Sequence, residues 1–546
     1  MSGIDSGRRA VLKQFVAVPT AVALGSMLWP EGAQAESITS QAPIDPRLHF
    51  LRRTSFGVRP ADWTRVQSLG IAAYLEEQLK ADAAKDPADA LATTLYPLAH
   101  LSGPAYWRVL YPVPTEAQLI GENNATIGKQ VTRANASLKA VEDYNEWERV
   151  QNQMGNNALY RALHSNRQLY EIMVQFWTNH LNSYDPTWRG EEQQVVIRKH
   201  ALGNFRAMIQ ASQKDTSMSR YLNNDQSKKP VPNQNYAREL LELHTLGQGN
   251  GYVQSDVEAM AAILAGHTWD KNRSSPTFGS YKYEPTWHVD GNKSFMGTTI
   301  ASNGKFEIDA AFAWIFGQHG DKVSKFIAFK LCRYFVSDTP PDALVQRVAT
   351  TFRNYGYEIQ PALRELLLSP EFAAARTEKD QRKLTRPVEY GVGVLRAFDI
   401  SITENVPPSL RQFVLDAGNR PFWWPTPDGY PDRGGFWAST SAFITRWNFA
   451  ALETERDVDN EKYLFNNNGS TRASRRVPKA ATPALSLVRS FADLLLHRPL
   501  TQAHEDLIVN YVTGNNPGHV MSVAEVQYWS TAIATILLAS PYAQFR

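Results

Sequence analysis

The sequence of 546 residues contains one cysteine, Cys332. A single thiol cannot form a disulfide within the chain, so the fold must be stabilised by burial of apolar surface rather than by covalent cross-links. Most neighbours of this cysteine in FIAFKLCRYF are apolar. That setting favours a buried structural thiol over a nucleophile, because a reactive cysteine needs a polar and accessible environment.

Long hydrophobic runs and an excess of charge are absent too. Beyond residue 35, no run approaches the roughly 18 apolar residues that span a bilayer, and the nearest is AMAAILAG at 259–266. We therefore expect no membrane span in the mature chain. Lysine and arginine total 57 against 54 acidic residues, and the resulting formal charge of +3 does not favour a nucleic-acid partner.

Several catalytic motifs are also missing. The sequence lacks the Gly-x-Ser-x-Gly nucleophile elbow, the phosphate-binding loop that ends in Gly-Lys-Ser/Thr, the Gly-x-Gly-x-x-Gly dinucleotide turn and the Cys-x-x-Cys-His haem site. Each motif places a nucleophile, a phosphate cradle or a covalent attachment point in a defined turn. Their absence argues against the standard hydrolase, nucleotide-dependent and covalent-haem classes.

Residues 1–35 have the organisation of a signal peptide. Arg8 and Arg9 precede an apolar run at 15–29, and the small residues AQA at 33–35 fit a cleavage site. The paired arginines followed by VLK at 11–13 resemble a twin-arginine export signal, and a general secretory signal with two chance arginines is the alternative. We expect the mature chain to begin near Glu36 and to be periplasmic or extracellular.

Helical periodicity recurs along the rest of the chain, whereas alternating strand patterns are few and short. We predict a mainly α fold, a large multi-helix globular protein with long irregular loops and little β structure. Because the length exceeds the ~250–300 residues at which a single core stops growing, two or three cores are expected. The predicted divisions are an N-terminal helical domain at 36–305, a second helical region with a Trp/Pro-rich loop at 306–465, a linker or surface loop at 466–483 and a C-terminal helical region at 484–546.

The stretch QNYARELLELHTLG at 234–247 carries most of the charged candidates. If residues 235–246 form a regular helix, Glu239 and Glu242 share one face, the geometry by which helix carboxylates hold a metal ion or act as an acid/base pair. The alternative is a solvated stripe in which Arg238 pairs with Glu242. His244 falls among the leucines on the opposite side, so it cannot join Glu242 in a zinc-binding helix. It is expected to be a core histidine bonded to a backbone carbonyl, or a cation near the helix C-terminus before Gly247.

A second helix is predicted over LYEIMVQFWTNHLNSYD at 169–185. His180 shares the apolar stripe of this helix, so its imidazole should project into the core, where it needs a hydrogen-bonding partner. Two arrangements fit that expectation. His180 is either a satisfied core residue, or it is aimed at the carboxylates of the 234–247 segment from a neighbouring helix.

Two turn-rich loops supply the remaining candidates. WHVDGNKSFMG at 287–297 places His288 and Asp290 close together in one turn. PFWWPTPDGYPDRGGFWAST at 421–440 contains three tryptophans and a tyrosine, whose flat rings could bind a polysaccharide or a peptide. The alternative is that these rings fill the core beneath a long loop.

These segments resemble a large bacterial family catalogued as a domain of unknown function, number eighteen hundred. The resemblance covers nearly all of the mature chain and rests on LHFLRRTSFGVRP, FWTNH, NYARELLELHTLG, FIAFKLCRYFVSDTPPDALV, LLLSPEF and PTPDGYP, in that order. It implies export, often by the twin-arginine route, and a companion exported protein encoded nearby, but no activity. The chain departs from the family pattern at Gln234, His267 and Val289, the last of which displaces the acid after His288 to Asp290.

Two functions are consistent with these observations. The first is an exported enzyme with His180, Glu239 and Glu242 as catalytic residues, in metal-assisted or carboxylate acid/base chemistry on an envelope or extracellular polymer. A divalent metal, where one is used, would be bound by these three residues together with His288 and Asp290. The second is a non-catalytic envelope protein that binds or assembles with its companion exported protein.

Overall fold

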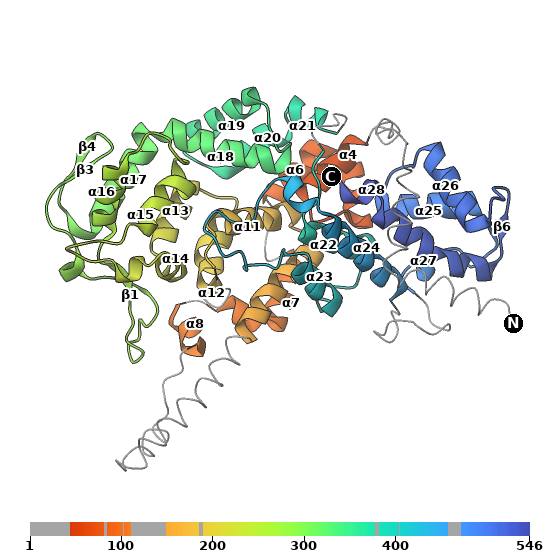
Figure 1. Ribbon diagram of the computed structural model, residues 1–546, viewed down its shortest axis with the longest axis horizontal. Coiled ribbons are helices and arrows are strands. Elements are labelled where there is room, and N and C mark those ends of the chain that lie inside the picture. The colour runs from red at the N-terminus through yellow and green to blue at the C-terminus, as the bar shows by residue number, and fades with distance from the viewer. Residues whose placement is uncertain are drawn as a thin grey trace, which may run out of the picture.

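Figure 1 shows the chain as a computed structural model, which describes residues 44–80, 85–101, 103–110, 149–184, 189–376, 382–402, 405–456 and 471–546. The predicted signal peptide at 1–35 lies outside the described residues, as does the first part of the predicted linker at 466–483. The rest of that linker contains a short 3-10 helix, η10 (Ser474–Arg476), and a strand that pairs with the C-terminal region.

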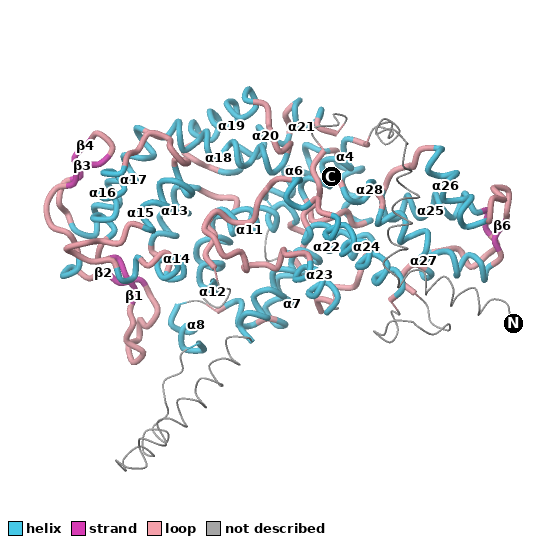
Figure 2. Tube along the Cα trace, viewed as in Figure 1, coloured by secondary structure: helices cyan, strands magenta, loops and turns pink. Residues whose placement is uncertain are grey.

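The fold is mainly α, which confirms the predicted fold class (Figure 2). The first half of the chain contains α4 (Pro46–Thr54), α5 (Pro60–Leu69), α6 (Ile71–Lys80), α7 (Pro87–Leu95), α8 (Gly103–Leu110), a helix at 149–164, α11 (Gln168–His180), α12 (Arg189–Glu192), α13 (Phe205–Gln213), α14 (Thr216–Tyr221), α15 (Asn235–Glu239) and α16 (Gln254–Leu264). The second half contains α17 (Glu307–Gln318), α18 (Gly320–Phe335), α19 (Asp342–Asn354), α20 (Ile359–Leu367), α21 (Pro370–Ala374), α22 (Pro387–Ala397), α23 (Pro408–Asp416), α24 (Thr440–Glu455), α25 (Ala484–Leu496), α26 (Gln502–Thr513), α27 (Val523–Ala539) and α28 (Pro541–Gln544).

Other helical geometries are short. Two segments of the described chain are π-helical, η3 (Gln193–Arg198) and η5 (Leu240–Thr245). The remaining 3-10 turns are η2 (Pro97–His100), η4 (Asn224–Gln226), η6 (Pro285–Trp287), η7 (Gly304–Phe306) and η9 (Gly434–Trp437). Within the described ranges, no helix combines the length and the apolar character needed to cross a bilayer.

The β structure in the described ranges consists of three antiparallel two-stranded pairs. They are β1 (His267–Trp269) with β2 (Tyr281–Tyr283), β3 (Lys293–Phe295) with β4 (Thr298–Ile300), and β5 (Thr482–Pro483) with β6 (Val520–Met521). Pairs this short have little stability of their own and need packing against helices. The β3 strand packs on α16, and the three short pairs are minor additions to a mainly helical fold (Figure 2).

Several helices begin with an acidic or hydroxyl cap followed by proline. The carboxylate of Asp45 accepts a hydrogen bond from the Arg47 amide at 2.8 Å before α4, and the hydroxyl of Ser369 accepts one from the Phe372 amide at 3.1 Å before α21. A cap side chain satisfies a backbone donor that the helix leaves free, and proline at the first position lacks that donor. The sequence therefore fixes where these helices start.

The two ends of the described chain lie together. In Figure 1, the N-terminal α4 sits beside α28 near the middle of the molecule. The Arg52 guanidinium of α4 donates to the carbonyls of Tyr542 at 2.8 Å and Leu496 at 3.0 Å. Apolar side chains form one continuous cluster from Leu48 in α4 to Tyr542 in α28. The division into the regions predicted above stays a prediction.

Buried Cys332 lies in this cluster, on α18. Burial raises the pKa of its thiol to about 12. The thiolate is therefore suppressed at neutral pH, as expected for a structural cysteine.

Candidate functional site

A cavity of about 290 Å³ opens where four distant segments meet. They are the C-terminal end of α11, the π-helix η5, the helix α18 and the loop 428–433. We call it the Lys330 pocket. It has aromatic walls from α11 and α18, and charged groups from α18 and the loop. The sequence stretches FWTNH, NYARELLELHTLG, FIAFKLCRYF and PTPDGYP each contribute to it.

Lys330 is the central group of this pocket. Its Nζ lies 2.9 Å from Nδ1 of His180 and 5.5 Å from the ring centroid of Phe326. Burial lowers the pKa of Lys330 to about 8; the carboxylates of Asp432 and Asp428 oppose this shift. An amine with such a pKa can exchange a proton near neutral pH, which an ordinary surface lysine cannot do efficiently.

The imidazole of His180 contacts the amine of Lys330 and is itself fixed by the backbone. Its Nε2 lies 3.2 Å from the backbone oxygen of His244. Because a carbonyl only accepts, Nε2 carries the proton and donates, which leaves Nδ1 to accept from the Lys330 ammonium. Burial, followed by the charge of Lys330, lowers the pKa of His180 well below its usual value, so the ring is neutral. The predicted inward orientation of His180 is confirmed, and both of its nitrogens are engaged.

His244 is 1 % exposed, as the helical wheel predicted, and its ring nitrogens form no hydrogen bond with any residue that the structure describes. Burial lowers its pKa to about 3. The expectation of a C-terminal helix cation is therefore wrong for this residue, because an uncompensated charge in this setting is strongly disfavoured. His244 is a neutral core histidine, but the expected hydrogen bond from its ring to a backbone carbonyl is not formed with the described residues. Its own backbone oxygen accepts from His180.

Glu239 ends α15, and Glu242 lies in η5. The expected regular helix over 235–246 is thus interrupted, since residues 240–245 are π-helical. Both carboxylates are partly buried, and Arg238 NH1 lies 3.5 Å from Glu242 Oε1, the pairing proposed as the alternative. Burial, then the negative charge of Glu242, raises the pKa of Glu239, and Asp428 raises it further.

The charge of Asp428 acts on both Glu239 and Lys330. The charge of Asp428 raises the pKa of both groups, so it lies within electrostatic reach of both. Glu239 is about one helical turn before Leu243, which lines the Lys330 pocket. Lys330 lines the pocket, whereas Glu239 is not one of its lining residues and belongs to the segment that contributes Leu243.

The loop 425–431 is fixed by two asparagines at the end of the α11 segment. Asn179 Nδ2 donates to the Tyr430 oxygen at 2.9 Å, and the Tyr430 amide donates to Asn179 Oδ1 at 2.6 Å. Asn182 Nδ2 donates to the carbonyl of Trp424, just before this loop, at 2.9 Å and to that of Thr426 at 2.7 Å. Gly429 has a φ of +75°, and a Cβ there would lie 2.2 Å from the Asn179 oxygen. The close approach therefore requires glycine.

Some rings of the aromatic loop are buried and others are at least partly exposed. Trp437 and Phe422 are buried, as expected of rings that fill the core. Trp424 is partly exposed, and Phe436 is 51 % exposed. The ring of Trp424 packs 4.9 Å from Tyr430 and 5.9 Å from Phe436, centroid to centroid. A partly exposed aromatic surface thus borders the Lys330 pocket.

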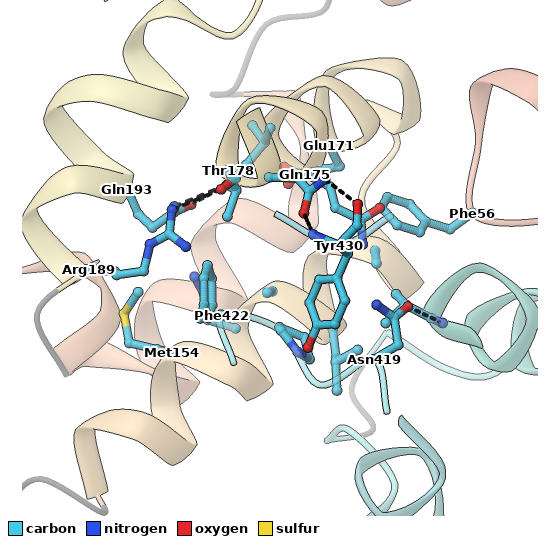
Figure 3. Close-up of a pocket in the computed structure, with 18 of the residues that line it drawn as sticks. Phe56, Met154, Glu171, Gln175, Thr178, Arg189, Gln193, Asn419, Phe422 and Tyr430 are labelled. Carbon is cyan, nitrogen blue, oxygen red and sulfur yellow. Dashed lines mark hydrogen bonds between the residues drawn. The ribbon is translucent and has the colours of Figure 1, made fainter. Parts of the chain in front are cut away.

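A second, smaller cavity of about 80 Å³ lies against another face of α11 (Figure 3). We call it the amide pocket because its polar lining includes the side-chain amides of Gln175, Asn182, Gln193 and Asn419. In Figure 3 the ring of Tyr430 projects among these lining residues. Tyr430 and Asn179 border both pockets, so the loop 425–431 forms part of the wall between them.

The charges around the amide pocket are paired. Three ion pairs border it, Arg189 with Glu192 at 2.6 Å, Arg198 with Glu171 at 2.6 Å and Arg386 with Glu389 at 2.8 Å. Paired charges leave little net field for an ionic ligand. Lys330, Arg333 and Arg433 line the Lys330 pocket and form no ion pair with a carboxylate of the described residues, which makes this pocket the stronger candidate for a reactive site.

The other predicted metal ligands lie elsewhere. His288 Nδ1 is 2.9 Å from the Ala265 oxygen, and Nε2 is 3.1 Å from Glu307 Oε1. Lys293 Nζ is 2.6 Å from Glu307 Oε2, which completes a buried triad. The side chain of Asp290 is 84 % exposed and pairs with Lys229 at 2.9 Å.

These contacts do not gather His180, Glu239, Glu242, His288 and Asp290 around one point. Among the residues that the structure describes, no group of three or more His, Cys, Asp or Glu side chains is placed to hold one metal ion. The pair Glu239 and Glu242 is the part of the predicted set that the structure does bring together.

Lys330, Asn179 and Asp428 were missed as functional candidates. The helix α18 buries Val323, Ile327 and Leu331 on one stripe, and Lys330 lies on the adjacent stripe. The sequence signal for Lys330 was a lysine preceded by two phenylalanines, in FIAFK at 326–330. A long lysine stem on the edge of an apolar stripe usually reaches water, so the signal was weak.

Comparison with known proteins gives one match. A family model described as "Protein of unknown function (DUF1800)" matches residues 49–545. No curated protein matches the chain. No solved structure matches it either.

Proposed function

Because the chain belongs to the DUF1800 family, whose description names no activity, we propose a function from the geometry of the Lys330 pocket. The proposed function is that of an exported enzyme that acts on an envelope or extracellular polymer by acid/base catalysis. One observation carries it: the amine of Lys330 is held 2.9 Å from a neutral imidazole inside a cavity of about 290 Å³.

The two proton-transfer groups are Lys330 as the acid and Glu239 as the base. Burial lowers the pKa of Lys330 to about 8 and raises the pKa of Glu239, so both values move toward neutrality. Proton transfer is most effective when the pKa of the group is near the working pH. At neutral pH Lys330 is largely protonated, which is the form that can donate a proton, and Glu239 has to be ionised to accept one. His180 acts through Lys330 and is a positioning residue.

Two further features support a polymeric substrate. Two exposed residues of the loop 428–433, Asp428 and Arg433, line the pocket. The partly exposed ring of Trp424 and the exposed ring of Phe436 extend the surface beside Tyr430, which also lines the pocket. Flat amphipathic rings bind the apolar faces of sugars and peptides well. A substrate longer than the pocket could therefore contact both the charged groups and the aromatic loop.

Export is proposed from the sequence of residues 1–35. Arg8 and Arg9 precede the apolar run in the order of a twin-arginine signal, a route used by proteins that cross the membrane folded. Cell fractionation of the full chain checks this part of the proposal, which fails if the protein stays in the cytoplasm.

Two glutamate variants test the acid/base assignment. Glu239→Gln removes the base and should lower kcat by about 10²-fold or more. Glu242→Gln is the matched control, because Glu242 pairs with Arg238 and its loss should change kcat only a few-fold. The assay follows the chain length of cell-wall and extracellular polymers. Equal activity of both variants, or no cleavage of any polymer by the natural protein, would contradict the proposal.

A second candidate function is a non-catalytic binding or assembly role with a companion exported protein. The exposed ring of Phe436 beside partly exposed Trp424 favours it, because aromatic residues are enriched in interfaces. Co-purification of the protein encoded nearby would support this role if Phe436→Ser abolishes it and Leu415→Ser, at an equally exposed position on α23, does not. No co-purification would rule it out.

A further inference from the structure

The cations of the Lys330 pocket outnumber the carboxylates that face them. Lys330, Arg333 and Arg433 line the pocket together with Asp428 and Asp432. Asp432 is shared with buried Lys383, whose Nζ lies 3.5 Å away. The carboxylate Oδ1 of Asp428 already accepts from the Trp424 indole at 3.2 Å. The pocket is therefore cationic where it is open.

The Arg333 side chain is fixed by two contacts that leave the terminal nitrogens of its guanidinium group available to a ligand. Its Nε donates to the Asp338 oxygen at 3.2 Å, and its guanidinium carbon lies 4.2 Å from the ring centroid of Phe329. These contacts fix the plane of the group, and neither Arg333 nor Arg433 forms an ion pair with a carboxylate in the part of the chain that the structure describes. A planar fork with free N–H donors binds a carboxylate with two parallel hydrogen bonds.

We propose that the Lys330 pocket binds an acidic sugar unit of a polymer, with its carboxylate on Arg333 and Arg433, and that the chain is cleaved there by β-elimination. This inference rests on the proposed acid/base function and names its substrate class. Two cations on the carboxylate stabilise the negative charge that develops when the neighbouring C–H bond breaks. The aromatic residues beside the pocket support the sugar rings on either side.

The step is balanced without a co-reactant. Glu239 takes the proton from the carbon next to the carboxylate, and the electron pair of that C–H bond forms a C=C bond. The bond from the next carbon to the glycosidic oxygen breaks. Lys330 donates its proton to that oxygen as it leaves. Glu239 ends protonated and Lys330 ends as a neutral amine, and exchange with water restores both.

The test uses the full mature chain with polygalacturonate, alginate and hyaluronan as acidic polymers, and with dextran and pullulan as neutral ones. Two signals are followed together: the ultraviolet absorbance of the conjugated double bond in the product, and the number of new reducing ends. We expect both signals to rise in parallel with at least one acidic polymer and with neither neutral one.

Arginine variants test the carboxylate site. Arg333→Gln and Arg433→Gln should each weaken binding of the cleaved polymer by about tenfold to a hundredfold, the range of a charge-assisted hydrogen-bonded pair. Arg433 is exposed, so its variant should fold normally even if that of Arg333 does not. Arg411→Gln, at an exposed position on α23, is the control and should change nothing.

Each of the other possible outcomes overturns a named part of the proposal. New reducing ends without the double-bond absorbance mean hydrolysis, which overturns the elimination and leaves the proposed acid/base enzyme standing. Cleavage of neutral polymers with unchanged activity of both arginine variants overturns the acidic substrate in the same way. Binding of acidic polymers without any cleavage also overturns the elimination. Absence of both binding and cleavage for every polymer overturns this inference and the proposed function together.

Discussion

Lys330→Met should leave the chain folded and reduce polymer cleavage by about 10²- to 10⁴-fold, the range for loss of a positioned proton donor. Methionine matches the length of the lysine stem, and Lys330 forms no ion pair in the described part of the chain that the change would break. Removal of a desolvated ammonium should leave stability unchanged or slightly higher. Initial rates and thermal unfolding of the two proteins give the comparison.

Lys325→Met on the same helix is the control, because Lys325 is exposed and away from the pocket. It should retain full activity. If Lys330→Met were as active as this control, Lys330 would not be the acid, and the site would have to be sought elsewhere.

The pH profile gives a second readout of the same assignment. Lys330 must be protonated to donate, so activity should fall as the pH rises through about 8. Glu239 must be ionised to accept, so activity should also fall below its raised pKa. The groups that face Lys330 are His180, Arg333, Asp428 and Asp432, and of these the two carboxylates hold its pKa up. Asp428→Asn should therefore move the alkaline limb to lower pH.

The helices were predictable because each shows its own periodicity. His180 was placed correctly toward the core, since the stripe of α11 is a local property of residues 169–180. The π-helix at 240–245 was not predictable from a helical wheel, which assumes 100° per residue. A short π-helix does not produce a pattern of apolar residues that differs recognisably from that of an α-helix.

The site itself depends on contacts between segments far apart in the chain. The hydrogen bond between His180 and Lys330 joins residues 150 positions apart, and the Asn179 contact with Tyr430 joins residues 251 positions apart. Neither pairing changes the local pattern on either side. The sequence therefore supplied the segments that meet at the pocket, and the tertiary fold alone decided which side chains face one another.

For His288, the partner expected from the local sequence is not the partner found in the fold. The sequence placed it beside Asp290, yet its acidic partner is Glu307, 19 positions away and completely buried. Asp290 instead pairs with Lys229 at the surface. The buried Glu307 also receives Lys293, which compensates its charge and makes the triad a structural element.

Beneath the Lys330 pocket, Glu389 compensates two buried guanidinium groups. Arg386 NH2 lies 2.8 Å from its Oε1 and Arg546 NH1 lies 2.9 Å from the same atom, and the Tyr334 hydroxyl donates to it at 3.1 Å. All four residues are at most 5 % exposed. Glu389→Gln would leave two buried cations without a counter-ion, and we expect a loss of about 3–5 kcal/mol in unfolding free energy. The denaturant midpoint measures this change.

An exposed pair provides the control for this prediction. The side chains of Arg347 and Glu365 are 42 % and 34 % exposed and lie 3.2 Å apart. Glu365→Gln should therefore change the unfolding free energy by less than about 1 kcal/mol. If Glu389→Gln prevents folding, the double variant Arg386→Met/Glu389→Gln should restore part of the stability, because one of the two uncompensated charges is then absent. A small effect of Glu389→Gln would show that water reaches this network.

The effect of Glu389 should also depend on pH in a defined direction. Burial opposes ionisation, but the charges of Arg386 and Arg546 outweigh it and lower the pKa of Glu389 from 4.5 to about 2. A group whose pKa is lower in the folded state contributes its full stability above the unfolded value and loses it as the pH falls toward the folded value. The stability difference between the natural protein and Glu389→Gln should therefore be constant above about pH 5 and shrink between about pH 4.5 and 2. A difference that stayed constant across that window would mean that Glu389 does not carry the charge that balances Arg386 and Arg546.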